Sequence, residues 1–263
     1  MEGGDAHPSP RRFPEIAEMI RTYARPATLD EALDLLAAPD AAVLAGGTDL
    51  NGDTSGAPAT AVDLQNLGLA GVNSDGEGLH IGAMTTLQAL ADADTAPPLI
   101  RDLAHREAPN TIRNAATVGG TIGSSDPESE LLAGLLVFDA SVTLAGKGGS
   151  TDVTLDRLLE DPTLLEGSII TSVTVATEGA GAAARTGRTP MDRPIVMVAG
   201  RSTPDGTLHL AATGVASRPV PLDPSDLTDL QPPGDFRGSP EYRRHLAEVL
   251  SRRVVDELKG GSS

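Results

Sequence analysis

Two segments of this chain place a Gly-Gly-Thr sequence directly after small apolar residues: Leu44–Leu50 and Thr117–Ser124. Glycine lets the backbone approach a ligand closely and turn successive N–H groups toward one point, so such a segment can bind an anion without a positive side chain. Neither segment has the G-x-G-x-x-G pattern or the P-loop Gly-Lys-Ser/Thr pattern, which excludes those two kinds of nucleotide site. For either segment alone a plain tight turn is the favoured interpretation, because glycine turns are common connectors. Together they suit a dinucleotide held from two sides.

Helical and strand patterns alternate around these segments. Thr28–Glu31 is a capping box ahead of a helix that should end before Pro39, and Thr85–Gln88 is a second capping box. Further helices are expected at 99–106 and 131–137, and short strands at 41–44, 61–64, 79–81 and 141–145. This alternation predicts an α+β fold.

The pattern changes at about residue 150. Strands are expected at 168–175, 194–201 and 208–215, with a turn at Pro204–Gly206, and together they predict an antiparallel meander. Ser239 and Pro240 then begin a long terminal helix. Its expected apolar stripe comprises Tyr242, Leu246, Val249, Leu250 and Val254.

Composition excludes several classes of function. The chain has no cysteine, so disulfides, thiolate metal sites and cysteine-ligated iron–sulfur clusters are excluded, and any such cluster must lie on another chain. A formal charge of −17 argues against nucleic-acid binding. No apolar run approaches the roughly 20 residues of a membrane span. The N-terminal stretch lacks the pattern of a signal peptide, so we expect a cytoplasmic protein.

Other reactive side chains have plainer explanations. The five histidines show no metal-ligand spacing, and Ser124–Asp126 lacks the G-x-S-x-G context of a nucleophile, so we expect neither a metal site nor a catalytic residue. Arg113 either binds phosphate or, as we favour, holds the second glycine segment through backbone carbonyls. The arginines of the terminal helix form either a solvated face or a surface for a partner: Arg243, Arg244, Arg252 and Arg253.

The order of motifs resembles the FAD-binding subunit of the molybdenum hydroxylases, the family of the carbon monoxide dehydrogenase medium chain and the xanthine dehydrogenase flavin domain. Three segments carry the resemblance: Tyr23–Leu33, Val43–Leu50 and Ile112–Ile122. It continues to about residue 258 through smaller matches at Asp126-Pro127, Glu130, Asp139-Ala140, Gly214-Val215, Arg218–Val220 and Glu241–Arg244.

This resemblance implies two small α+β lobes that bind FAD between them, followed by a C-terminal α+β domain with antiparallel strands and a long terminal helix. The corresponding ranges are an extension at 1–22, an FAD-binding domain at 23–165 with lobes at 23–75 and 76–165, and a C-terminal domain at 166–263. Residues on one side of the FAD pyrophosphate would be Ala45, Gly46, Gly47 and Thr48, and those on the other side Thr117, Gly119, Gly120, Thr121 and Ser124. Asp49 would lie close to the flavin, and Glu130 would bind the adenosine portion.

The resemblance also implies partners. Electrons would leave a molybdopterin-binding large subunit, cross a 2Fe-2S small subunit, and pass through this FAD to NAD, a quinone or oxygen.

The chain departs from the family pattern at Thr121, where asparagine is usual, and at Glu130, where aspartate is usual. Each change retains a donor or an acid, so we expect weaker but not absent FAD binding. The segments 51–61 and 222–234 are shorter than usual, which puts the usual partner contacts in doubt. Two alternatives stay open: a free-standing FAD-dependent oxidase or dehydrogenase, and a flavin-free scaffold subunit.

Overall fold

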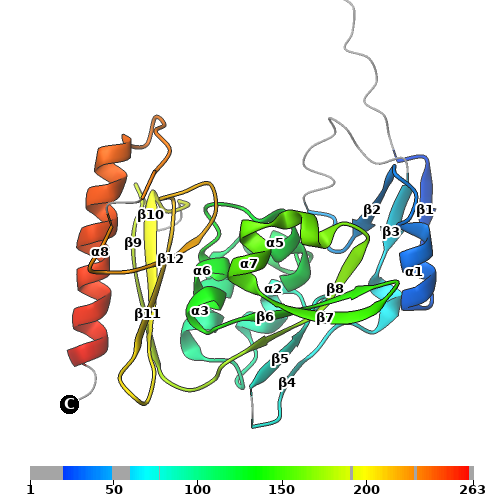
Figure 1. Cartoon of the computed structure of the whole chain (residues 1–263), viewed down its shortest axis with the longest axis horizontal. Coiled ribbons are helices and arrows are strands. Elements are labelled where there is room, and N and C mark those ends of the chain that lie inside the picture. The colour runs from blue at the N-terminus through cyan, green and yellow to red at the C-terminus, as the bar shows by residue number, and fades with distance from the viewer. Residues whose placement is uncertain (1–19, 49–59, 77, 190–191, 228–229, 261–263) are drawn as a thin grey trace, which may run out of the picture.

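The computed structural model describes residues 20–48, 60–76, 78–189, 192–227 and 230–260 (Figure 1). The first lobe is a small parallel sheet with strand order β1-β3-β2, covered by one helix. Its elements are β1 (Thr22–Ala24), α1 (Leu29–Leu35), β2 (Ala41–Leu44) and β3 (Thr60–Asp63). The predicted capping box is confirmed, because Thr28 Oγ1 accepts the Glu31 amide at 3.2 Å and Glu31 reaches back to the Ala27 amide at 2.9 Å.

The second lobe contains an antiparallel sheet of order β4-β5-β8-β6-β7 together with several helices. Its strands are β4 (Val72–Ser74), β5 (Leu79–Gly82), β6 (Ser141–Gly146), β7 (Gly149–Thr154) and β8 (Ser168–Val175). Its helices are α2 (Leu87–Ala91), α3 (Pro98–Arg106), α4 (Asn110–Arg113), α5 (Val118–Ser124), α6 (Glu130–Val137) and α7 (Leu155–Glu160), with 3₁₀ turns at Gln65–Leu67 and Pro162–Leu165. Helix α6 is buried on almost every side, as its continuous apolar sequence predicts.

The C-terminal domain is an antiparallel sheet of order β12-β11-β10-β9 with one long helix against it (Figure 1). Its elements are β9 (Ala180–Thr186), β10 (Val196–Ser202), β11 (Leu208–Thr213), β12 (Val220–Leu222) and α8 (Pro240–Gly260). Alternate residues of β10 face opposite sides: Val196 and Val198 pack with α8, whereas Met197 and Ala199 join the core that contains α3 and α6. The sheet therefore lies between α8 and the second lobe, and the predicted α+β fold class is confirmed.

Three predictions about individual elements are wrong. Strand β8 pairs with β5 and β6 of the second lobe and is not part of a meander with β10 and β11. Helix α2 is capped by Thr86, whose Oγ1 accepts the Ala89 amide, and not by Thr85, which bonds the backbone of Gly71.

The sheet pairing also favours a domain boundary after β8 instead of at residue 165, although the division into domains stays a prediction.

The third wrong prediction concerns the terminal helix. Arg243 was expected on its polar face and Tyr242 on its apolar stripe, but Arg243 is buried and Tyr242 is exposed. The Arg243 guanidinium donates to the carbonyl oxygens of Ile195 and Gly214 at 2.7 and 3.0 Å and pairs with Asp235 at 2.9 Å. These partners offset the cost of removing the charge from water.

Candidate functional site

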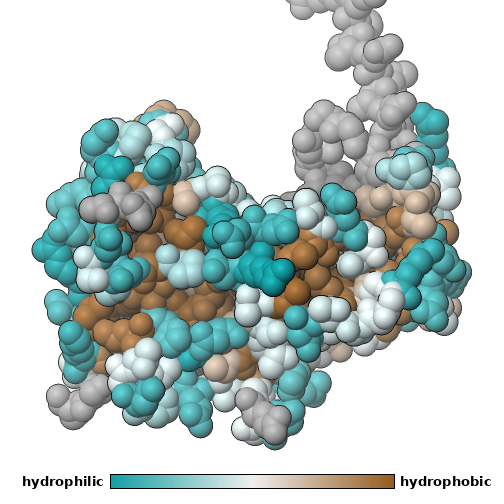
Figure 2. All heavy atoms as spheres, viewed as in Figure 1, coloured by the Kyte–Doolittle hydropathy of each residue, from teal (hydrophilic) through white to brown (hydrophobic). Residues whose placement is uncertain are grey.

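A cavity of about 490 Å³ lies between the first and second lobes, within the range typical of small-molecule sites. It brings together nine of the residues predicted for cofactor binding: Ala45, Gly46, Gly47, Thr48, Thr117, Gly119, Gly120, Thr121 and Ser124. Apolar side chains from both lobes complete the wall, among them Val43, Leu64 and Ile170. Figure 2 shows hydrophobic residues reaching the surface in this region, near α5 and β8.

The first glycine segment reaches the cavity as an open turn after β2. Gly47 has a φ of +71°, the left-handed conformation that glycine adopts without strain. Gly46 lies so close to the second lobe that a β-carbon there would stand 2.1 Å from the Ala115 carbonyl oxygen. Within the described residues, the amides of Gly46, Gly47 and Thr48 donate no hydrogen bond. These amides are therefore available to an anion, as predicted.

The second glycine segment is not the predicted loop but the short helix α5. Thr117 caps it, accepting the Gly120 amide at 3.1 Å, and Val118 and Ile122 are buried. The amides that were expected to bind an anion are all taken within the chain: Val118 donates to Thr85 O, Gly119 to Ala83 O, Gly120 to Thr117 Oγ1 and Thr121 to Thr117 O. This segment supplies shape to the cavity, while backbone donors come from the first one.

Hydroxyl groups of the second segment are likewise engaged. Thr121 donates to the Thr117 carbonyl at 3.1 Å, and Ser124 donates to the Thr121 carbonyl at 3.0 Å. Each hydroxyl oxygen can still accept a further hydrogen bond. Gly119 is required for packing, because a β-carbon there would stand 2.8 Å from the Ala83 side chain.

Three charged residues that are not among the predicted site residues line the cavity: Glu107, Asp126 and Arg193. Glu107 is the C-cap residue of α3, and its Oε2 accepts the Leu131 amide at 2.8 Å. Burial raises the pKa of the Glu107 carboxyl to about 7, although hydrogen bonds from Ser129 and Leu131 and the charge of Arg193 act in the opposite direction. No motif marks these positions, because they meet only when α3, the α5–α6 turn and the C-terminal domain come together.

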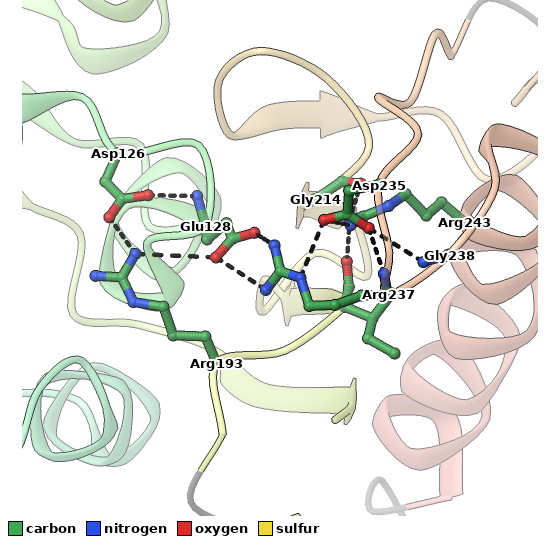
Figure 3. A network of polar contacts seen from close by, with 9 residues as sticks. Asp126, Glu128, Arg193, Gly214, Asp235, Arg237, Gly238 and Arg243 are labelled. Carbon is green, nitrogen blue, oxygen red and sulfur yellow. Dashed lines mark hydrogen bonds and ion pairs between the residues drawn. The ribbon is translucent and has the colours of Figure 1, made fainter. Parts of the chain in front are cut away.

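Arg193 connects the cavity to the terminal helix through a row of ion pairs (Figure 3). It binds Asp126 and lies 3.9 Å from Glu128, which in turn pairs with Arg237. Arg237 bonds Asp235 at 3.1 Å, and Asp235 pairs with the buried Arg243 of α8. The C-terminal domain is thereby fixed against the turn that forms one wall of the cavity.

Comparisons with known proteins decide the family. The sequence pattern of the FAD binding domain in molybdopterin dehydrogenase matches residues 16–177. The chain belongs to this family. It is 29% identical to the carbon monoxide dehydrogenase medium chain of Afipia carboxidovorans, covering 90% of this chain and 96% of that protein. It is 28% identical to the xanthine dehydrogenase FAD-binding subunit of Escherichia coli O157:H7, covering 90% and 95%.

Solved structures agree with this assignment. A chain of the reconstituted CO dehydrogenase from Oligotropha carboxidovorans matches with a TM-score of 0.83 at 27% identity, over 94% of this chain and 99% of that one. The fold and the cofactor predicted from the resemblance are therefore confirmed: the chain has the fold of the flavin subunits, and its cofactor is FAD.

The described residues fit FAD. Gly46 brings the first lobe into close contact with Ala115 of the second, and Gly119 brings α5 into close contact with Ala83, so both glycines shape the cavity. Three free amides are suited to the negative charge of a pyrophosphate, and apolar side chains are suited to a ring system. FAD supplies the redox chemistry when bound, and the protein supplies its binding and orientation.

Two predicted contacts do not lie in the cavity wall. Glu130 is buried beside it at the start of α6, 3.0 Å from Arg185, and its Oε2 has no hydrogen-bond partner among the described residues. Its adenosine contact stays a prediction. Asp49 lies outside the described residues. Arg113 has the structural role we favoured, because its guanidinium donates to the carbonyls of His105 and Ala108 and to Gln88.

Two of the histidines have ordinary partners: His80 contacts Asp75 and Thr174, and His209 contacts Asp139. Nowhere in the described part of the chain do three or more His, Asp or Glu side chains gather as they would to hold a metal ion. Over the same ranges, each helix is too short or too polar to cross a membrane.

Proposed function

We propose that this chain is the electron-transfer subunit of a molybdenum-containing hydroxylase or dehydrogenase complex. Its partners would be a molybdopterin-binding large subunit and a 2Fe-2S small subunit, and its FAD would pass their electrons to an acceptor such as NAD, a quinone or oxygen. One observation carries the proposal: the cavity between the lobes collects both glycine segments in a chain that belongs to the FAD-binding family. The proposed compartment is the cytoplasm.

The absence of cysteine supports a division of labour among subunits. This chain cannot itself hold a cysteine-ligated cluster, so electrons that reach its FAD from iron–sulfur centres must come from another chain. By their names, the two relatives above are a medium chain of one dehydrogenase and an FAD-binding subunit of another, which supports a role as one subunit among several. Within this chain, the first glycine segment would bind the pyrophosphate through its free amides, and the second would position the cofactor by contact.

A free-standing FAD-dependent oxidase or dehydrogenase is the second candidate. Between β12 and α8, the described residues contain no helix, which agrees with the shortened segment noted in the sequence. Family members usually carry a helix there, so the usual contacts with partner chains are in doubt. A flavin-free scaffold is not a candidate, because the chain belongs to the FAD-binding family.

Purification of the full chain alone separates these candidates. A flavin absorption spectrum, or its appearance on titration with FAD, first measures how much FAD the isolated chain holds. Reduction by substrate is attempted with and without the molybdopterin-binding and 2Fe-2S chains of the proposed complex. Reduced protein is then mixed separately with NAD, a quinone and oxygen. Reduction by substrate only in the presence of those chains supports the subunit; substrate reduction of the isolated chain supports the free-standing enzyme.

A further inference from the structure

The cavity has an unusual balance of charge for a site that binds an anionic dinucleotide. Its described lining carries two acids, Glu107 and Asp126, and one cation, Arg193. Arg193 is already paired with Asp126, and its other neighbour is a third acid, Glu128, at 3.9 Å. An ionised Glu107 would therefore add a negative charge to the cavity with no cation paired to it.

Burial favours the neutral form of Glu107. Its Oε2 accepts the Leu131 amide, and this bond and a hydrogen bond from Ser129 act in the opposite direction without cancelling the effect of burial. Burial raises the pKa of this carboxyl to about 7, so a change of state falls in the physiological range. In the described chain, no ion pair joins Glu107 to a cation.

Neighbouring charges are already compensated or directed elsewhere. Beyond the pair of Asp126 with Arg193, the acid next along α6 is Glu130, which is paired with Arg185 of β9. Arg113 of α4 donates to uncharged oxygens. On its own helix, His105 and Arg106 are exposed, and Arg106 pairs with Asp102. Among these charged groups, Glu107 is the one that lines the cavity without a paired cation. Its protonation state is therefore the one that an anion in the cavity would change.

We propose that Glu107 contacts bound FAD as a neutral carboxylic acid, so that FAD binding takes up one proton at this side chain. The inference rests on the cavity being the FAD site, as proposed above. The negative pyrophosphate disfavours the ionised carboxylate, and the neutral acid can donate its O–H to an acceptor atom of the cofactor. Linkage then makes the affinity for FAD fall as pH rises above the pKa of Glu107 in the cofactor-free protein.

The test is FAD titration of the full-length apoprotein at pH 6 and pH 8.5. Wild-type protein should bind about thirtyfold more weakly at the higher pH, because each unit above the pKa changes affinity about tenfold. Glu107→Gln, which keeps the acceptor for Leu131 and resembles the neutral acid, should bind equally at both. Glu160→Gln, at an exposed glutamate that ends α7, should keep the wild-type dependence.

Calorimetry of the wild type in buffers of different protonation enthalpy gives an independent answer if Glu107→Gln folds poorly. Uptake of about one proton per FAD at pH 8 is expected. Uptake near zero, or equal wild-type affinity at both pH values, overturns the inference. Gly123→Leu, which adds a side chain to the cavity wall, tests separately whether FAD binds in this cavity. If this variant binds FAD as tightly as wild type, the cavity is not the FAD site, and both the proposed function of the cavity and the inference about Glu107 are wrong.

Discussion

The two glycine segments share the sequence Gly-Gly-Thr and meet in one cavity, yet they contribute different things to it. In the first, Gly46, Gly47 and Thr48 form an open turn whose amides donate to nothing within the described residues. In the second, the same three residue types lie in helix α5, and all of their amides are already hydrogen-bonded. A shared short motif therefore does not imply a shared role; the residues before it decide whether it forms a turn or a capped helix.

Each segment also contains one glycine that leaves no room for a side chain. Gly46 lies against the Ala115 carbonyl of the second lobe, and Gly119 lies against Ala83 within the second lobe. Replacing such a glycine tests folding as much as cofactor binding, so the two effects have to be measured separately.

Gly46→Val should cause the largest loss. Its β-carbon would meet a backbone carbonyl at 2.1 Å, which no side-chain adjustment can relieve. We expect the free energy of unfolding to fall by about 3 kcal/mol, measured by urea denaturation, together with loss of FAD binding. Gly148→Val, where a β-carbon would meet nothing within 4 Å, is the matched control. A loss below about 1 kcal/mol would mean that the walls are not held together at this point.

Stability should also depend on pH through Glu107, beside the second segment. The pKa of Glu107 in the folded protein is about 7, above its ordinary value of 4.5, so the folded state binds more protons between these values. Relative to Glu107→Gln, the free energy of unfolding of the apoprotein should be highest below pH 4.5 and fall by up to about 3 kcal/mol as pH rises through 7. Parallel curves for the two proteins would show that Glu107 titrates normally.

Gly123→Leu should reduce FAD binding without unfolding the protein. A β-carbon at Gly123 meets nothing within 4 Å, although the residue lines the cavity. We expect at least a tenfold loss of FAD affinity, about 1.4 kcal/mol, with stability unchanged or slightly raised because leucine favours a helix more than glycine does. Equilibrium titration and urea denaturation of the same preparation measure both quantities.

Thr117→Val should have the smallest effect and is the sharpest test of the comparison. It removes the cap of α5 without changing side-chain volume much, at a cost of about 1 kcal/mol in stability. Thr154→Val removes the equivalent cap of α7 and should cost a similar amount. FAD affinity should change little in either variant. If Thr117→Val instead abolished FAD binding at normal stability, its hydroxyl would be a cofactor ligand and the two segments would be more alike than the structure indicates.

Local patterns predicted most individual elements well, because capping and apolar periodicity act over a few residues. The helix after Thr28 and the terminal helix after Ser239 both begin where the sequence places them. Pairing over long distances was not predictable in the same way: the alternation in β8 identifies a strand but not its neighbours. Thr85 and Thr86 are both possible caps, and only the contact of Thr85 with Gly71 decides between them.

In the candidate site, too, local motifs were predictable from the sequence and long-range contacts were not. The glycine segments were found because each is a continuous motif, but α5 was taken for a loop because three of its seven residues are glycine. Burial of Val118 and Ile122 and the Thr117 cap stabilise it as a helix. The roles of Glu107, Asp126 and Arg193 in the cavity wall were not predicted, although Asp126 was part of the family resemblance, because the three residues are far apart in the sequence and become neighbours only through tertiary packing.

Strand β8 belongs to two cores at once. Ile169 is buried in the core of the first lobe, and the adjacent Ile170 is buried in that of the second, while both line the cavity. Moving the lobes apart about a hinge would pull Ile169 out of its core, so the two lobes should behave as one rigid body. Cofactor exchange would then depend on rearrangement of the first glycine segment at the rim, and not on opening of the molecule between its halves.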